Sequence, residues 1–152
     1  MTKILFVCHG NICRSPMAEY YMKDLVCRMG REDAYEIATA ATSTEEIGNP
    51  VYPPARRELR RHGIACEGHH ARQMTWADYS YYDYLIGMDH ENLYYMPRIC
   101  GGDPEGKISL LLDYTDRPGE VADPWFTGNF TQTWADVEEG CQGLFRYLEE
   151  RN

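Results

Sequence analysis

A short apolar run near the start of the chain leads directly into a cysteine, and an arginine precedes a helical pattern a few residues later. Residues 4–7 read Ile-Leu-Phe-Val, which is typical of a central strand buried on both faces of a parallel sheet. The segment from Cys8 to Arg14 then forms a tight loop, and Ser15 and Pro16 are expected as the N-cap and first residue of a helix. This order of strand, loop and helix places the loop at the carboxyl end of its strand, where ligands bind in α/β sheets.

The rest of the chain alternates between strand-like and helix-like segments, with Asp89 as a further expected helix cap and a polar loop through Pro118 and Pro124. The expected strands are 35–42, part of 66–71, 84–88 and 107–112, and the expected helices after the first are 55–62, 76–82, 90–98 and 132–151. This alternation favours an α/β sandwich with a mostly parallel sheet.

Composition fits one domain over residues 1–152, because neither a repeat nor a linker interrupts the chain. Hydrophobic residues make up 43% and charged residues 26%, as in an ordinary globular protein. The net charge of −9 argues against nucleic acid or a membrane surface as a partner. The N-terminal apolar run is too short for a signal peptide or a membrane span. Six cysteines in a chain large enough for its own core are expected to be free thiols, so we expect a cytoplasmic protein.

The loop between Cys8 and Arg14 has the makings of an anion site. Its backbone N–H groups can point into one concavity, the following helix adds about half a positive charge, and Arg14 adds a full charge in bidentate geometry. Such a field is expected to favour the Cys8 thiolate at neutral pH. A cysteine and an arginine at this spacing occur often by chance, but their position between a strand and a helix start indicates a loop that binds a phosphoryl group and supplies its nucleophile.

Asp123 is the candidate general acid. A phosphate monoester leaves as an alkoxide unless its bridging oxygen is protonated, and Pro124 restricts Asp123 to extended conformations. Trp125 and Phe126 follow and are expected to form one wall of a slot deep enough for an aryl phosphate. Taken alone, an Asp-Pro pair also fits a loop turn and the two aromatics also fit the core.

Residues 7–19, Val-Cys-His-Gly-Asn-Ile-Cys-Arg-Ser-Pro-Met-Ala-Glu, resemble the signature of the low-molecular-weight protein tyrosine phosphatases. Residues 123–125 resemble the general-acid loop of that family, and shorter similarities at 39–42, 61–64, 71–73 and 88–89 extend the resemblance over nearly the whole chain. The resemblance implies a three-layer sandwich with a four-stranded parallel sheet flanked by helices. It also implies a metal-independent phosphoric monoester hydrolase without a cofactor, in which Cys8, Arg14 and Asp123 are catalytic.

The same resemblance assigns supporting residues. Asn11, Ser15, Thr39 and His69 correspond to positions whose hydrogen bonds shape the phosphate-binding loop, although relatives usually carry serine at the position of Thr39. Cys13 is expected to trap an oxidised Cys8 in a reversible disulfide, and a simple packing role behind the loop also fits it. The phosphate-binding loop is expected to comprise His9, Gly10, Asn11, Ile12, Cys13 and Ser15.

Two further positions concern the pocket rim and a possible metal. Glu45 stands where some relatives carry an aromatic on the wall opposite Trp125, so an acidic rim that prefers a basic residue near phosphotyrosine is expected. The adjacent His69 and His70 lack further ligands at suitable spacing, so we expect no metal site.

The expected substrates are phosphotyrosine-containing proteins or aryl phosphates, with inhibition by phosphate or vanadate-like anions. Arsenate reductases of this fold need a closely spaced cysteine pair, whereas Cys66 and Cys100 lie far apart. Protein-arginine phosphatases, the nearer alternative, carry threonine at the position of Ile12. A non-catalytic phosphate-binding module would need neither the thiol nor the acid.

Overall fold

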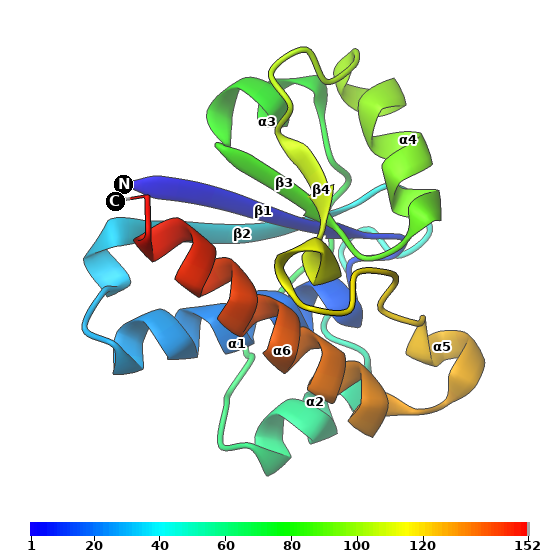
Figure 1. The fold of residues 1–152 in the computed structure, drawn as a ribbon. Helices are drawn as coiled ribbons and strands as arrows, with labels where there is room; N and C mark the ends of the chain where they lie inside the picture. Colours follow the sequence, from blue (N-terminus) through cyan, green and yellow to red (C-terminus); the bar gives the residue numbers. More distant parts are fainter. Residues whose placement is uncertain (152) are drawn as a thin grey trace.

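The apolar N-terminal run forms the central strand β1, Thr2–Cys8. In the computed structural model, which describes residues 1–151, β1 pairs in parallel with β2, Tyr35–Ala41, on one side and with β3, Tyr84–Gly87, on the other. Strand β4, Ile108–Leu110, pairs in parallel with β3, which gives the order β2-β1-β3-β4. The predicted four-stranded parallel sheet is therefore confirmed (Figure 1).

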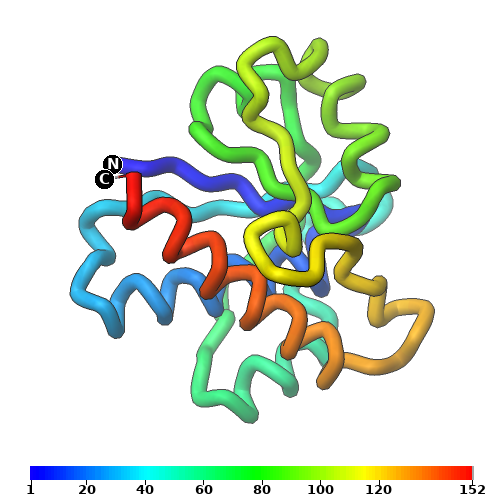
Figure 2. Tube along the Cα trace, in the orientation of Figure 1, coloured from blue at the N-terminus to red at the C-terminus, as the bar shows by residue number. Residues whose placement is uncertain are grey.

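Both faces of this sheet are covered by helices, which explains why β1 is apolar at every position from 4 to 7. Ile4 and Phe6 point into one core, and Leu5 and Val7 point into a second core on the other face. The three layers are visible in the ribbon and in the tube (Figures 1 and 2). Helices α1 (Arg14–Arg28), α2 (Pro53–Arg61) and α6 (Phe130–Glu149) cover the first face, and α3 (Trp76–Tyr81) and α4 (His90–Cys100) cover the second.

The first helix begins two residues earlier than predicted, and Ser15 is not its cap. Helix α1 starts at Arg14, and Cys13 precedes it as the N-cap, whose carbonyl accepts the N–H of Met17. The Ser15 hydroxyl is instead engaged with Cys8 and Asn11. The prediction failed because the serine side chain bonds back into the preceding loop rather than to its own helix.

The strand predicted within 66–71 does not form. Gly68 adopts a left-handed conformation with φ of 89°, which interrupts an extended strand. The backbone of Ala71 is paired with the loop at Gly48 and Asn49, and the nearest sheet contact is a single bridge from Gln73 to β2.

The remaining short elements lie before β2 and after β4. A 3-10 helix, η1, spans Glu32–Ala34, and a second, η2, spans Leu111–Tyr114 and cuts short the strand predicted over 107–112. Helix α5, Pro124–Thr127, lies within the segment predicted as a polar loop. No helix in residues 1–151 combines the length and the apolar composition that crossing a membrane requires.

Helix α6 passes very close to η2 at two glycines. A Cβ atom added at Gly143 would overlap the backbone carbonyl of Tyr114, and one added at Gly140 would overlap the side chain of Leu111. These glycines let the last helix pack against the segment that follows β4, which leads on towards Asp123.

We expect Gly143→Ala to lower the free energy of unfolding by about 2 kcal/mol. The added methyl group would meet the backbone carbonyl of Tyr114, which cannot rotate away as a side chain can. At an unconstrained helix position the same change would stabilise the protein by about 1 kcal/mol. Gly140→Ala is the matched control and should cost less, since the Leu111 side chain can move. Urea denaturation measures both; a Gly143→Ala protein more stable than the parent would contradict this close packing.

Candidate active site

The Cys8 sulfur lies at the carboxyl end of β1 in polar surroundings. Its Sγ is 3.0 Å from the Ser15 Oγ and accepts the backbone N–H of Asn11 at 3.3 Å. The residue is only 3% exposed, yet it lines the pocket at this edge of the sheet. The sulfur therefore faces hydrogen-bond donors rather than the apolar core.

Asn11 makes the sharp turn between β1 and α1. With φ of 61°, it is the one non-glycine residue within 1–151 in the left-handed region, a conformation that costs roughly 1–2 kcal/mol. Three hydrogen bonds hold it there. Its Nδ2 donates to Ser15 Oγ at 2.8 Å, its Oδ1 accepts the N–H of Arg72 at 3.1 Å, and its carbonyl accepts His69 Nε2–H at 2.7 Å.

These bonds also orient the serine proton. Because Ser15 Oγ accepts a hydrogen bond from Asn11, its own proton is free to point to the Cys8 sulfur. The loop thus supplies two donors, an amide and a hydroxyl, to one sulfur atom.

A buried carboxylate on α1 links the two other supporting residues. Glu19 Oε1 accepts the hydroxyl of Thr39 at 3.2 Å and lies 4.0 Å from Nδ1 of His69, while its Oε2 is 2.7 Å from Lys23 Nζ. Thr39 and His69 therefore meet at Glu19, and His69 alone of the two contacts the loop. Glu19 belongs to the signature recognised in the sequence, but no role was predicted for it. Because Glu19 follows Ser15 by four residues, the two lie on the same face of α1, and this spacing could have linked Glu19 to the site.

Arg14 is fixed by groups that arrive from two distant segments. Its Nη1 donates to Asp89 Oδ2 at 2.7 Å and to the carbonyl of Val121 at 2.9 Å, and its Nη2 lies 3.5 Å from Asp123 Oδ2. Burial of the guanidinium opposes its charge, but Cys8, Asp89 and Asp123 outweigh burial and raise the pKa of Arg14. Asp89, predicted only as the cap of α4, thus also orients the arginine. Asp89 lies just beyond β3, at the carboxyl end of the sheet, where Cys8 also lies. This position could have predicted a role in the site.

Asp123 caps the short helix α5 and projects to the pocket. Its Oδ1 accepts the N–H of Trp125 at 3.0 Å, and its backbone is extended, with φ of −74° and ψ of 114°, as expected before Pro124. Trp125 is 54% exposed and Phe126 is 85% exposed, so neither belongs to the core. The Trp125 ring packs against Tyr52, with centroids 4.8 Å apart.

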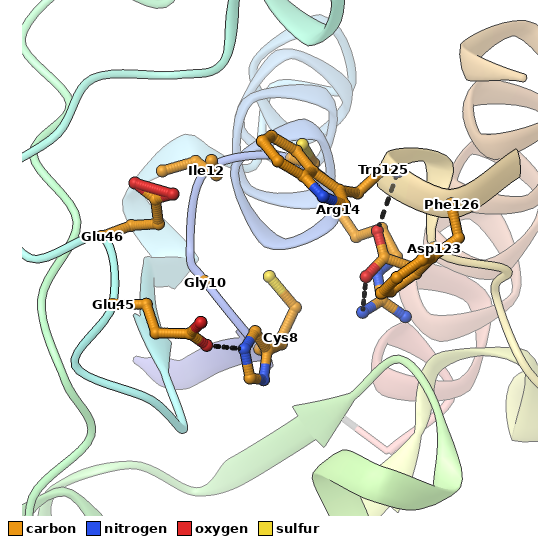
Figure 3. Close-up of a pocket in the computed structure, with 11 residues that line it drawn as sticks. Cys8, Gly10, Ile12, Arg14, Glu45, Glu46, Asp123, Trp125 and Phe126 are labelled. Carbon is orange, nitrogen blue, oxygen red and sulfur yellow. Dashed lines mark hydrogen bonds and ion pairs between the residues drawn. The ribbon is translucent and has the colours of Figure 1, made fainter. Parts of the chain in front are cut away.

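The pocket lies between α5 and the loop that follows β2. Figure 3 shows Glu45 and Glu46 on one side, Asp123, Trp125 and Phe126 on the other, and Cys8 between them. Asn11, Ser15, Thr39 and His69 are not among the residues that line it. The lining residues are Cys8, His9, Gly10, Ile12, Cys13, Arg14, Glu45, Glu46, Asp123, Trp125 and Phe126.

Cys13 lines the same pocket as Cys8, and both are free. Burial, together with Cys8 and Asp123, raises the pKa of the Cys13 thiol. The two cysteines are therefore unlike: one sulfur accepts hydrogen bonds from an amide and a hydroxyl, and the other is held as a neutral thiol.

The neighbouring histidines diverge. His69 bonds the carbonyl of Asn11, whereas His70 Nδ1 lies 3.3 Å from the carbonyl of Gly48. Within residues 1–151, no three His, Cys, Asp or Glu side chains gather so that they could hold a metal ion.

Known proteins resemble this chain over nearly all of its length. A family model described as "Low molecular weight phosphotyrosine protein phosphatase" matches residues 3–152. The low molecular weight protein-tyrosine-phosphatase YfkJ of Bacillus subtilis is 38% identical over 152 residues, which cover 99% of this chain and 97% of that protein. The low molecular weight phosphotyrosine protein phosphatase of Gallus gallus is 40% identical over 140 residues, covering 91% and 87%.

Solved structures agree with the sequence matches. The crystal structure of Bacillus subtilis YfkJ superposes with a TM-score of 0.96 at 37% identity and covers 100% of this chain and 97% of that one. The structure of a Drosophila arginine phosphatase superposes with a TM-score of 0.89 at 28% identity, covering 97% and 98%. With a matching family model, a matching fold and a pocket built on the family's signature, this chain belongs to the low molecular weight protein tyrosine phosphatases.

Proposed function

We propose that the pocket hydrolyses phosphotyrosine in two steps, with Cys8 as nucleophile, Arg14 as phosphate clamp and Asp123 as general acid and base. The observation that carries this proposal is that three segments meet at the carboxyl end of the sheet. The sulfur at the end of β1, the first residue of α1 and the cap of α5 all face the same pocket.

In the first step the Cys8 sulfur attacks phosphorus, an S–P bond forms, and the bond from phosphorus to the tyrosine oxygen breaks. Asp123 donates its proton to the departing oxygen. The backbone N–H groups of the loop and the guanidinium of Arg14 stabilise the charge on the equatorial oxygens. Support for this assignment comes from Arg14 itself, whose Nη1 is tied to Asp89 and Val121 while its Nη2 faces Asp123.

In the second step a water molecule attacks phosphocysteine, and the Asp123 carboxylate accepts its proton. The S–P bond breaks and the thiolate of Cys8 is restored, stabilised by the hydrogen bond from Ser15. Asn11, Thr39 and His69 act as positioning residues in this proposal: Asn11 and His69 hold the loop by hydrogen bonds, and Thr39 bonds Glu19, which lies beside His69. Free phosphate and vanadate-like anions should occupy the same loop and inhibit.

The walls of the pocket favour an aryl ring. Trp125 and Phe126 stand exposed on one side, and Ile12 presents an apolar side chain beside the loop. Phosphoserine is too short to reach a sulfur below such walls. The similarity to an arginine phosphatase makes phosphoarginine the relevant competitor, and the apolar Ile12 disfavours its polar guanidinium.

We also propose that residues 1–152 form one phosphatase domain that works in the cytoplasm. The family model spans residues 3–152, which supports the single domain. All six cysteines are free, as a reducing compartment favours.

The substrate class is tested by kcat/KM for three peptides that differ only in carrying phosphotyrosine, phosphoserine or phosphoarginine. We expect phosphotyrosine to exceed both others by at least about a hundredfold, since a misplaced reacting group loses the gain from orientation. A preference for phosphoarginine would overturn the phosphotyrosine proposal and leave the cysteine chemistry intact.

Asp123→Ala should reduce kcat roughly a hundredfold or more for phenyl phosphate, whose leaving group needs a proton, and far less for para-nitrophenyl phosphate. Asp116→Ala, which removes an exposed carboxylate from the loop preceding α5, is the control and should change neither rate. Steady-state rates over a series of aryl phosphates measure the difference. Equal losses for good and poor leaving groups would remove Asp123 from its role as acid.

Cys13 is proposed to protect the nucleophile from oxidation. Peroxide converts the Cys8 thiolate to sulfenic acid, and attack by the Cys13 sulfur then yields a disulfide and releases water. Cys13→Ser enzyme should therefore lose activity irreversibly under peroxide, whereas the parent and a Cys27→Ser control regain it with dithiothreitol. Cys27 is the control because it is exposed on α1 and away from the pocket. Full recovery of the Cys13→Ser enzyme would reject this role.

A further inference from the structure

A second hollow adjoins the catalytic pocket and shares His9 and Glu45 with it. Its other walls include Thr42, which directly follows β2, and Glu91 and Tyr95, which lie one turn apart on α4. Because the two spaces share lining residues, a peptide whose phosphotyrosine enters the first can place a neighbouring side chain in the second.

This flanking hollow carries negative charge without a matching cation. The His9 ring bridges two carboxylates: its Nε2 contacts Glu45, and its Nδ1 lies 3.2 Å from Glu91 Oε1. The His9 ring can carry at most one positive charge against the two carboxylates, so the hollow remains net negative. The glutamate side chains are 65% and 57% exposed, and neither lysine nor arginine is among the described residues that line the hollow.

A buried hydroxyl on the same wall lacks a partner. Thr42 is 8% exposed, and its Oγ1 has no hydrogen bond among the residues that the structure describes. Leaving a buried polar atom unpaired is unfavourable, and Thr42 lines the hollow. This oxygen is itself enclosed, so the Thr42 side chain must rotate before the oxygen can accept a hydrogen bond from a donor that arrives with the substrate.

Tyr95 adds an aromatic surface beside the carboxylates. It is 46% exposed, and it packs edge to face on Tyr94 with centroids 5.0 Å apart. Elsewhere on the same helix, the guanidinium of Arg98 stacks over the Tyr94 ring at 3.5 Å. An incoming guanidinium could stack on the Tyr95 ring by the same cation–π interaction.

We propose that the flanking hollow binds an arginine side chain next to phosphotyrosine in the substrate, so that the enzyme selects phosphotyrosine in basic sequences. A guanidinium presents five donors and no acceptor, which matches two carboxylates and a hydroxyl oxygen beside an aromatic ring. The inference rests on the proposed function of the catalytic pocket, since the arginine is delivered by a bound phosphopeptide. It assigns Glu91, Thr42 and Tyr95 to substrate selection and gives a physical basis to the acidic rim expected at Glu45.

The test compares phosphopeptides that carry arginine, or its neutral isostere citrulline, at each position next to phosphotyrosine in turn. An exposed ion pair contributes modestly, so two carboxylates should favour arginine by roughly three- to tenfold in kcat/KM at one position. The ratio of arginine to citrulline cancels any effect on the chemical step. It should fall as salt is raised, because screening weakens exposed charges.

Glu91→Gln should lower this ratio, and the double variant with Glu45→Gln should bring it to about one. Glu105→Gln is the matched control. It removes an equally exposed carboxylate (65%) from the segment before β4, at the amino ends of the strands and so at the opposite end of the sheet from the site.

Hydrolysis of para-nitrophenyl phosphate separates this inference from the proposed function. A parent enzyme that fails to hydrolyse para-nitrophenyl phosphate would overturn the proposed function. Full hydrolysis with equal rates for arginine and citrulline peptides, or an arginine preference that survives in the double variant, would overturn this inference alone.

Discussion

The left-handed turn at Asn11 is the constraint on which the site depends. It reverses the chain between the end of β1 and the start of α1, and it is held by the His69 ring, the backbone N–H of Arg72 and the Ser15 hydroxyl. Because of this turn, the N–H of Asn11 and the hydroxyl of Ser15 both reach the Cys8 sulfur. Relaxing the turn would remove both donors at once, since the same asparagine supplies one and orients the other.

Positive charge around this turn is confined to the phosphate-binding loop, although the chain as a whole carries a net charge of −9. The loop amides, the start of α1 and Arg14 supply that charge, whereas Glu45, Glu46 and Asp123 line the same pocket. Glu45 and Glu91 make the neighbouring hollow negative, and His9 stands between them. A phosphotyrosine flanked by a cation has charges complementary to the positive loop and the negative hollow. An acidic protein can in this way bind one phosphate ester and discriminate among the sequences that carry it.

Features that depend on local sequence could be predicted, and features that depend on distant contacts could not. The all-apolar run at 4–7 predicts a doubly buried strand, and Asp89 is predicted correctly as the cap of α4. The contact of Asp89 with Arg14 joins residues far apart in sequence, so no local sequence pattern predicts this contact. The helix cap predicted at Ser15 is wrong, because its hydroxyl is engaged with Cys8 and Asn11 in the preceding loop, where the family resemblance had also placed its role. Helix α5 is a single turn, too short for periodicity to reveal.

During turnover we expect the Cys8 sulfur in this loop to form a covalent bond to phosphorus. Rapid acid quenching of the enzyme with an aryl phosphate, followed by mass spectrometry of its peptides, measures that bond directly. We expect a transient phosphoryl group on the peptide that contains Cys8, and no such group in Cys8→Ser enzyme, which should still bind vanadate but no longer turn over substrate. A phosphoryl group on any other residue, or continued turnover by Cys8→Ser, would exclude Cys8 as the nucleophile.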